Sequence, residues 1–192
     1  MTIGITGGIG SGKSYVSRWL EQHYQIPVYD CDSQAQRLMR GRVLRRKITA
    51  LVGEDAYRPD GQLDRVRMAA YVFGDASHTA AINSIVHPAV KADFRRWAKR
   101  REGLVAIESA ILIEAGFHDV ADKVIVVEAP LPLRIRRVVE RDHTTEEQVR
   151  ARIARQISDE ERRRAADLVI INDGSDFSPQ LKSFIESLII QQ

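Results

Sequence analysis

Residues 7–14 read GGIGSGKS and place two glycines, a lysine and a serine at the spacing G-x-x-x-x-G-K-S. A short apolar run at residues 2–6 precedes this stretch and predicts a strand, and a helical pattern at residues 13–24 follows it. A strand, a glycine-rich turn and a helix in this order form the context that a phosphate-binding loop requires. The alternative is an ordinary glycine-rich turn, which would leave the lysine and the serine to coincidence. The stretch therefore predicts binding of a nucleoside triphosphate.

Each residue type in this loop has its own task. Glycines such as Gly8, Gly10 and Gly12 let the backbone adopt conformations that a Cβ would block, so that successive N–H groups turn toward phosphate oxygens. The start of the following helix adds unpaired N–H groups and its positive dipole end. We expect Lys13 to reach the β- and γ-phosphates and the Ser14 hydroxyl to ligate Mg²⁺. The motif alone does not separate a kinase from a GTPase or a motor.

Length and composition predict one globular unit with an insertion. The chain has 192 residues, of which 44% are hydrophobic, enough for one substantial core. No apolar run approaches the length of a membrane span, and no basic leader precedes the first strand, so we expect a cytoplasmic protein without a membrane partner. The only cysteine, Cys31, has no internal partner for a disulfide, which fits a reducing compartment. No His/Cys cluster has metal-ligand spacing.

Arginines are concentrated in one segment although the net charge is only +3. Such a segment could clamp a polyphosphate or contact nucleic acid. Acidic residues interleave with the arginines at helical spacing, however, which is typical of a solvated helix face. We therefore expect most of them to face solvent, a minority to touch ligand, and no nucleic acid to bind. The arginines are Arg134, Arg136, Arg137, Arg141, Arg150, Arg152, Arg155 and residues 162–164.

Five apolar runs rich in β-branched residues predict buried parallel strands. Helical patterns separate the runs, so the sequence predicts an α/β fold with a doubly wound, five-stranded parallel sheet and a ligand site at the carboxyl ends of the strands. The strands are expected at residues 3–5, 27–29, 104–107, 124–127 and 168–171. The helical patterns cover residues 13–24, 33 to about 101, 131–141, 146 to about 166, and 179–190.

Two connections are too long to be simple crossovers. Residues 33–102 hold enough helical sequence for a region that binds a second substrate, and residues 134–166 suit a lid that excludes water during phosphoryl transfer. The nucleotide-binding core would then comprise residues 1–32, 103–133 and 167–192. Within the first connection, His87 precedes a proline and is interpreted as a helix boundary, or alternatively as a contact to the second substrate.

Acidic residues follow three of the predicted strands. Asp30 and Asp32 come after the second strand, where a carboxylate could accept the proton of an attacking hydroxyl or hold Mg²⁺ through water. Asp32 could instead cap the next helix, with Ser33 as a rival cap. Glu108 and Glu128 close the third and fourth strands, and either one could help to order Mg²⁺ or merely begin a loop.

Two tryptophans fall within amphipathic helical patterns. Trp19 and Trp97 are expected to belong to the core rather than to form stacking platforms.

Beyond the loop, an ordered set of motifs resembles the dephospho-CoA kinase family. The pieces are TGGIGSGKS at 6–14, VYDCD at 28–32, DGQLDR at 60–65, IVHP at 85–88, ESAILIEAGF at 108–117, DKVIVVEAP at 122–130, RVVERD at 137–142, Gln156, and ADLVIINDG at 166–174. They follow the family order across nearly the whole chain. The resemblance implies an enzyme that phosphorylates the ribose 3′-hydroxyl of 3′-dephospho-CoA with ATP and Mg²⁺, the last step of coenzyme A synthesis.

The resemblance also implies roles for matching positions and a P-loop nucleoside triphosphate hydrolase fold like that of adenylate kinase. Asp32 corresponds to the family's catalytic base, and Arg65 and His87 lie in the region used for the CoA moiety. Arg141 matches a lid arginine expected near the ATP phosphates, and Asn172 lies in the loop expected beside adenine. The ATP loop corresponds to Gly8, Gly10, Ser11, Gly12, Lys13, Ser14 and Tyr15. A monomer or a weak homo-oligomer is expected.

The chain departs from the family pattern at two positions. Tyr15 stands where the family usually has Thr, and Ala110 stands where it usually has Pro. We expect Tyr15 to face into the first helical turn, with little effect on the chemistry.

Three other functions are consistent with a phosphate-binding loop. A kinase for nucleoside monophosphates or another small alcohol would share the loop and the lid. A regulatory GTP-binding switch needs the guanine-reading motif N-K-x-D, which the sequence lacks. A nucleic-acid-binding ATPase would use the arginine-rich segment in a salt-dependent way.

Overall fold

The structure, a computed structural model, describes residues 1–190, without the side chains of residues 76 and 118. The chain divides into two compact units. The core unit comprises Met1–Tyr29 and Arg100–Gln192, and the helical unit comprises Asp30–Lys99.

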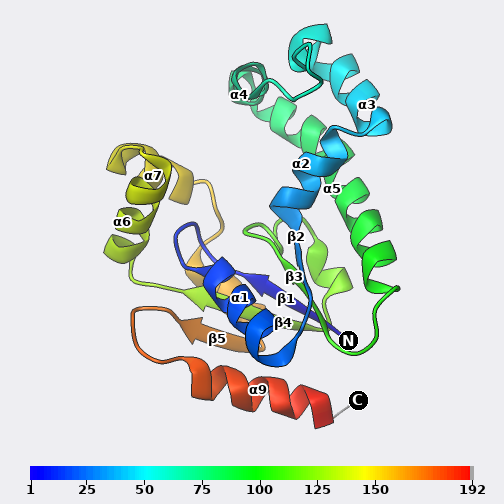
Figure 1. Cartoon of the computed structure of the whole chain (residues 1–192). Helices are drawn as coiled ribbons and strands as arrows, with labels where there is room; N and C mark the ends of the chain where they lie inside the picture. The colour runs from blue at the N-terminus through cyan, green and yellow to red at the C-terminus, as the bar shows by residue number, and fades with distance from the viewer. Residues whose placement is uncertain (191–192) are drawn as a thin grey trace. The chain divides into compact units, whose positions relative to one another are not determined.

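A five-stranded sheet organises the core unit (Figure 1). The strand order is β2-β3-β1-β4-β5, and β1 pairs in parallel with both β3 and β4, while β4 pairs in parallel with β5. The strands are β1 (Thr2–Thr6), β2 (Val28–Asp30), β3 (Val105–Glu108), β4 (Lys123–Glu128) and β5 (Leu168–Ile171). All five predicted strands are present, each within two residues of its expected ends.

The central strands are buried because helices cover the sheet. Ile125, Val126 and Val127 of β4 have no exposed surface, as expected for a parallel sheet built from an uninterrupted apolar run. Helix α1 (Lys13–Tyr24) and helix α9 (Ser178–Ile190) contribute apolar side chains to one cluster with the sheet. Leu20 of α1 and Leu181 of α9 are both buried in this cluster.

Three shorter helices lie between β4 and β5, namely α6 (Leu131–Asp142), α7 (Glu146–Ile153) and α8 (Asp159–Arg164). The helical pattern predicted from residue 146 to about 166 is divided between two helices. Helix α7 ends at Ile153, and α8 begins with its own capping box, in which Ser158 and Glu161 satisfy each other's backbone N–H groups. A 3₁₀ turn, η2 (Phe117–Val120), precedes β4.

The helical unit contains α2 (Cys31–Met39), α3 (Arg42–Val52), α4 (Arg65–Gly74) and α5 (Ala76–Ala98), with the 3₁₀ turn η1 at Glu54–Ala56. Helix α5 packs against the other three helices. Aspartates cap three of the four helices, because the side chains of Asp30, Asp64 and Asp75 accept backbone N–H groups of the first turns.

The expected helix boundary at His87 is wrong, because α5 continues through Pro88. A proline inside a helix removes one backbone hydrogen bond and costs roughly 3 kcal/mol in an isolated helix. The packing of α5 offsets that cost, since its buried residues recur every four positions along one face. These residues are Ile82, Val86, Val90 and Phe94.

Among the described helices, none combines the length and the apolar character that crossing a bilayer requires.

The burial of β4 gives a test of the fold. Ile125→Ala should lower the free energy of unfolding by about 2–5 kcal/mol, because it leaves a cavity in the sheet core. Ile171 on β5 is 41% exposed, and Ile171→Ala should cost under about 1 kcal/mol. Urea unfolding followed by circular dichroism measures both values. Equal losses for the two variants would contradict the assigned burial.

Candidate nucleotide-binding site

The glycine-rich loop joins the carboxyl end of β1 to the start of α1. Gly10 and Gly12 have φ angles of 78° and 95°, in the left-handed region where a side chain is strained. A Cβ at Gly12 would also lie 1.9 Å from Nδ2 of Asn172, and one at Gly10 would lie 2.4 Å from the carbonyl oxygen of Arg134. The two glycines are therefore required both by backbone conformation and by close neighbours.

The side chains of Lys13 and Ser14 donate hydrogen bonds to different partners. The Lys13 ammonium donates to the carbonyl oxygen of Gly7 at 3.1 Å, so the charge lies against the start of the loop. The Ser14 hydroxyl donates to Oε1 of Glu108 at 2.8 Å. Glu108 ends β3, where it is paired with Ile5 of β1 and is 9% exposed.

Glu108 and Glu128 both end strands, and their contacts show which of them lies beside the phosphate-binding loop. Glu108 contacts the loop serine, whereas Glu128 accepts two hydrogen bonds from Arg163, at 2.7 Å from Nε and 2.5 Å from Nη2. The hydrogen bonds that Arg163 donates to Glu128 raise the pKa of Arg163. Glu128 is thus occupied by an arginine, and Glu108 is the carboxylate beside the loop.

The donor set beside the loop fits Mg²⁺. A serine hydroxyl and a carboxylate are the hard oxygen ligands that Mg²⁺ prefers, and Mg²⁺ commonly takes its remaining ligands from phosphates and water. In the part of the chain that the structure describes, no group of three or more His, Cys, Asp or Glu side chains could hold a metal by itself. A metal here would depend on phosphate oxygens as well as on Ser14 and Glu108.

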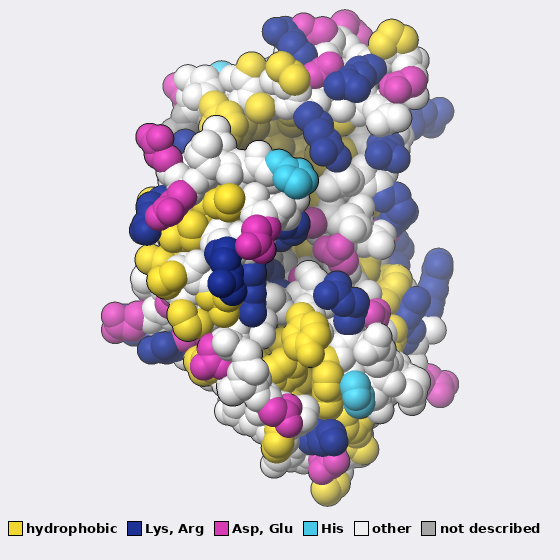
Figure 2. Space-filling view, turned by 60° about the vertical axis from the view of Figure 1, so that its left-hand side comes forward, with side chains coloured by type: hydrophobic (Ala, Val, Ile, Leu, Met, Phe, Trp, Pro, Cys, Tyr) yellow, Lys and Arg dark blue, Asp and Glu magenta, His cyan; other side chains and the backbone are white. Residues whose placement is uncertain are grey.

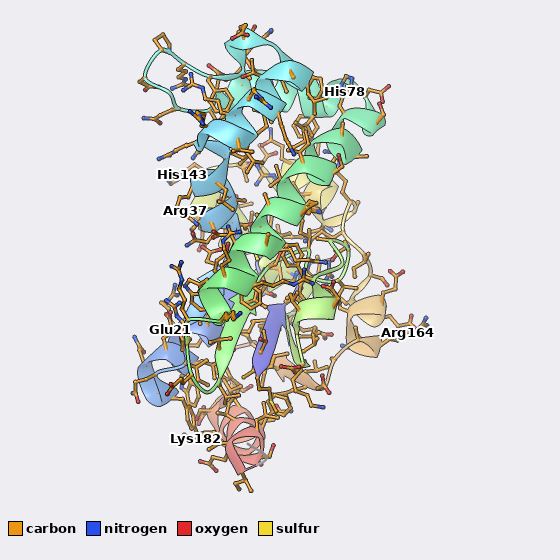
Figure 3. All side chains as sticks on the ribbon, turned by 90° about the vertical axis from the view of Figure 1, so that its right-hand side faces the viewer. Glu21, Arg37, His78, His143, Arg164 and Lys182 are labelled. Atoms are coloured by element: carbon orange, nitrogen blue, oxygen red, sulfur yellow. The ribbon has the colours of Figure 1, made fainter. Side chains whose placement is uncertain are left out.

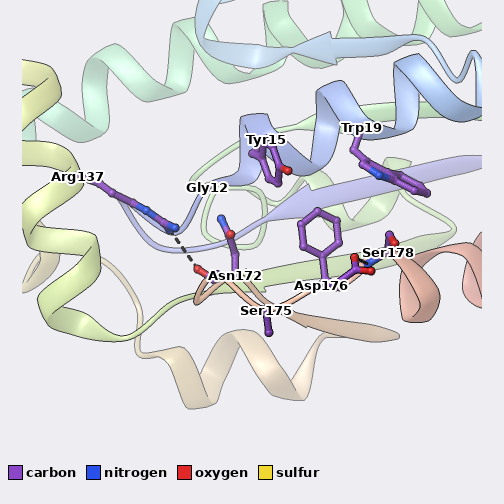
Figure 4. Close-up of a pocket in the computed structure, with 10 residues that line it drawn as sticks. Gly12, Tyr15, Trp19, Arg137, Asn172, Ser175, Asp176 and Ser178 are labelled. Atoms are coloured by element: carbon purple, nitrogen blue, oxygen red, sulfur yellow. Dashed lines mark hydrogen bonds between the residues drawn. The ribbon is translucent and has the colours of Figure 1, made fainter.

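Two adjoining cavities open along the loop. The larger one has a volume of about 590 Å³ and is lined by Gly12, Tyr15, Trp19, Arg137, Asn172 and residues 174–178 (Figure 4). The smaller one has a volume of about 320 Å³ and is lined by Gly10, Gly12, Lys13, Ser14, Tyr15, Arg18, Arg137, Val138 and Arg141. Gly12, Tyr15 and Arg137 line both. The result is an elongated site with a charged end at the loop and a wider, partly aromatic end.

Asn172 links the wider end to the loop. Its side chain is buried, and Nδ2 donates to the carbonyl oxygen of Ser11 at 2.9 Å. Its own carbonyl oxygen accepts a hydrogen bond of 3.2 Å from Arg137, which Figure 4 shows as a dashed line. Asn172, Arg137 and the loop therefore form one connected wall of the larger cavity.

The expectation that Tyr15 faces into the first helical turn is wrong. Val16 and Leu20 form the buried stripe of α1, and Tyr15 and Trp19 lie on the neighbouring face. Tyr15 is 53% exposed, packs edge-to-face on Phe177 with ring centroids 5.6 Å apart, and lines both cavities.

Both tryptophans are only partly buried, so the expectation of two core residues holds in part. Trp19 packs against the core cluster but also lines the larger cavity and stacks on His23, with centroids 4.2 Å apart. Trp97 packs against the buried ring of Phe94 within the helical unit.

Arg141 lies at the charged end of the site. It lines the smaller cavity and donates to Oδ1 of Asp142 at 2.7 Å, and Arg152 donates to the same carboxylate at 2.9 Å. The hydrogen bond from Arg141 lowers the pKa of Asp142. Arg141 therefore keeps its charge at the cavity rim with an acidic neighbour at its side.

Several arginines of the 134–164 segment face solvent as expected. Arg150 pairs with Glu146 and Arg164 with Glu160 in exposed contacts one helical turn apart. Figure 3 shows Arg164 projecting outward from its helix, and Figure 2 shows basic side chains lying among acidic ones on the face that it displays.

Three arginines of the segment do not face solvent, and two of them, Arg134 and Arg137, contact the loop without having been singled out as site residues. Arg134 and Arg162 are 3% and 1% exposed, and Arg137 is half-buried against the loop. Arg137 donates to the carbonyl oxygens of Ser11 and Asn172, and more weakly to that of Gly10. A signal did exist, because the buried residues Ile135 and Val138 define the inner face of α6 and place position 134 beside it.

Asp30 and Asp32 belong to the helical unit. Asp30 caps α2, accepting from the backbone N–H of Asp32 at 3.0 Å and from the hydroxyl of Ser33 at 2.5 Å. The interpretations of Asp32 or Ser33 as the cap are therefore wrong, because α2 already begins at Cys31. Asp32 lies exposed in the first turn of α2.

The other residues assigned to the second substrate also lie in the helical unit. Arg65 begins α4 and lines a cavity of about 130 Å³ with Arg40 and four neighbours. His87 is half-buried on α5, and burial, together with the nearby charge of Lys91, lowers its pKa from the ordinary value of 6.5.

The core unit thus presents a phosphate-binding loop at the carboxyl end of the central strand of a parallel sheet, with a hydroxyl, a carboxylate and an elongated cavity beside it. These features define a P-loop nucleotide-binding protein.

Comparisons with known proteins narrow this class. The family model described as dephospho-CoA kinase matches residues 1–177. The dephospho-CoA kinase of Bacteroides fragilis is 44% identical over 97% of this chain and 92% of its own length, and that of Corynebacterium diphtheriae is 42% identical over 90% and 88%. The chain therefore belongs to the dephospho-CoA kinase family.

Solved structures agree on the fold. A protein of Thermus thermophilus superposes with a TM-score of 0.85 and 36% identity over 98% of this chain and 97% of its own. Shikimate kinase from Acinetobacter baumannii superposes with a TM-score of 0.57 and 16% identity over 99% and 93%, a likeness of fold alone. Together with the five-stranded parallel sheet, these neighbours establish the P-loop nucleoside triphosphate hydrolase fold.

The lowered pKa of His87 predicts a pH effect on stability. As pH falls below about 6.5, the unfolded chain takes up the proton before the folded chain does, so the folded state loses stability. The melting temperature of the wild type should fall more than that of His87→Gln between about pH 7.5 and about pH 5.5. Differential scanning calorimetry measures both, and a larger fall in the variant would contradict the assignment.

Proposed function

We propose that this protein transfers the γ-phosphoryl group of ATP to the ribose 3′-hydroxyl of dephospho-CoA, giving coenzyme A and ADP. The observation that carries the proposal is the joined pair of cavities, which brings Lys13, Ser14 and Arg141 to one end and Asn172 to the other. A nucleotide fits this arrangement, with its phosphates at the loop and its base at the wider end. Family membership supports dephospho-CoA as the acceptor.

We assign the donor half of the reaction to the core unit. Lys13 and the loop N–H groups hold the transferring phosphoryl group, and Arg141 offsets the charge that develops there. Ser14 and Glu108 would hold Mg²⁺, which would neutralise part of the phosphate charge. The remaining loop residues, from Gly8 to Tyr15, shape the phosphate site, and Asn172 lies beside the base.

We assign the acceptor half to the helical region at residues 33–102, with residues 134–166 acting as a lid over a core formed by residues 1–32, 103–133 and 167–192. Asp32 orients the 3′-hydroxyl and accepts its proton, and Asp30 or Asp32 would hold Mg²⁺ through water. Arg65 and His87 bind the CoA moiety. A loose transition state asks little of a base, so Asp32 contributes mainly by orientation.

We also propose that the enzyme acts in the cytoplasm as a monomer or a weak homo-oligomer, without nucleic acid. Cys31, the single cysteine of the sequence, is buried and cannot form a disulfide within the chain, which is compatible with a reducing compartment.

A coupled assay of ADP release tests the reaction. With Mg²⁺-ATP, the purified protein should release ADP only when dephospho-CoA is present, and AMP, CMP and gluconate should not replace it. Lys13→Ala and Asp32→Asn should each lower kcat by at least about a hundredfold while circular dichroism stays unchanged. Turnover of AMP in place of dephospho-CoA would favour a nucleoside monophosphate kinase. Near-normal turnover by Asp32→Asn would remove Asp32 from the reaction.

The two strand-ending glutamates provide a matched pair for the metal assignment. Glu108→Gln should raise the Mg²⁺ concentration needed for half-maximal activity by about tenfold or more, because a neutral amide replaces a carboxylate beside Ser14. Glu128→Gln removes the same charge from the partner of Arg163 and should leave the Mg²⁺ requirement unchanged. Titration of activity with Mg²⁺ at saturating ATP measures both. An equal shift in the two variants would contradict the assignment to Glu108.

A further inference from the structure

Arg134 is a buried cation in direct contact with the phosphate-binding loop. It lies in the first turn of α6 with 3% of its surface exposed, and its Nε donates to the carbonyl oxygen of Ile9 at 3.0 Å. Its Nη2 fills the space beside Gly8, where a Cβ would lie only 2.0 Å away. The guanidinium therefore packs on one residue of the loop and hydrogen-bonds the next.

The loop residue Ile9 is held from both sides of its backbone. Its N–H donates to Oε1 of Gln156 at 2.9 Å, while its carbonyl oxygen accepts from Arg134. Gln156 follows α7 in the chain, and Arg134 belongs to α6. A glycine-rich segment that would otherwise be mobile thus has its tip fixed by two side chains from more than a hundred residues away.

The direction of the Arg134 side chain is itself fixed by Asp159. Nη1 of Arg134 donates to Oδ2 of Asp159 at 2.9 Å, and the same carboxylate accepts from the buried Arg162 at 2.8 Å. Arg162 also lies 3.7 Å from Glu114, in the loop that follows β3. The positive charge of Arg134 is paired, so its contribution to the site is geometric rather than an added attraction for phosphate.

We propose that Arg134 is a positioning residue for the phosphate-binding loop, which it holds ready for the nucleotide through Ile9 and Gly8, with Asp159 as the group that orients it. Glycine-rich backbone loses much conformational freedom when it is ordered, and this loss weakens binding unless it occurs before the ligand arrives. A loop that is already ordered binds more tightly because that cost is removed from the binding step. Identifying the ligand as ATP or ADP rests on the proposed function.

Direct binding of ADP to the full chain, measured by isothermal titration calorimetry, tests this role. Arg134→Gln should raise the Kd for ADP by about tenfold or more, the effect of losing a hydrogen bond from a charged group. The Kd of Arg134→Lys should lie between those of the wild type and Arg134→Gln, because an ammonium can reach either Ile9 or Asp159 but not both. Arg136→Gln removes the same charge from an exposed position on the same helix and should leave the Kd unchanged.

The measured Kd values for ADP distinguish a positioning role of Arg134 from a merely structural one. A Kd within about twofold of the wild type for folded Arg134→Gln, with only its melting temperature lowered, would show a structural role and overturn the proposal. If Arg134→Gln fails to fold, Asp159→Asn carries the test: the proposal requires a raised Kd for ADP, and an unchanged one overturns it. A wild-type protein that does not bind ADP would contradict the proposed function itself, whereas normal wild-type binding with an unchanged variant contradicts only the role of Arg134.

Discussion

The hydrogen bonds that side chains make to the backbone of the phosphate-binding loop are the interactions on which the site depends. The carbonyl oxygens of Gly8 and Gly12 accept N–H groups of the loop and the first turn of α1, whereas other carbonyl oxygens of the loop accept side chains from distant parts of the chain. Arg134, Arg137 and Asn172 are the donors at Ile9, Ser11 and neighbouring carbonyl oxygens. All three donors come from the part of the chain after β4. The amino-terminal motif and the part of the chain after β4 therefore form one site.

The same dependence explains why so many arginines occur in a chain with a net charge of only +3. Those on the inner faces of α6 and α8 act as rigid hydrogen-bond donors in the interior, each with an acidic partner or a carbonyl oxygen. Those on the outer faces form exposed pairs one helical turn apart, which contribute little to stability. Arginine thus serves both as a buried hydrogen-bond donor and as a partner in exposed ion pairs, and the helical period decides which face each arginine occupies.

Hydrophobic pattern was enough to locate all five strands, since a short apolar run between helices has few other stable arrangements. Predictions from local sequence rules were wrong where tertiary packing outweighed the local preference. The proline rule placed a boundary at His87, but the buried face of α5 carries the helix through Pro88. The helical pattern from residue 146 to about 166 did not indicate the break after which Ser158 begins a new helix. For Tyr15, the neighbouring stripe of Val16 and Leu20 decided which way the ring faces, and that stripe became clear only from the sheet beneath it.

The sequence by itself determined the chemistry of the donor end, because the spacing from Gly7 to Ser14 is a local arrangement whose conformation follows from glycine freedom and a helix start. It also determined the class of fold and, through the ordered motifs, the family. Only the tertiary structure decided that Glu108 rather than Glu128 faces the loop serine, and that Arg134 is buried beneath the loop while Arg136 is exposed. The reason is that strand order and helix packing bring together residues about a hundred positions apart, and no local pattern encodes which of two similar side chains meets a distant partner.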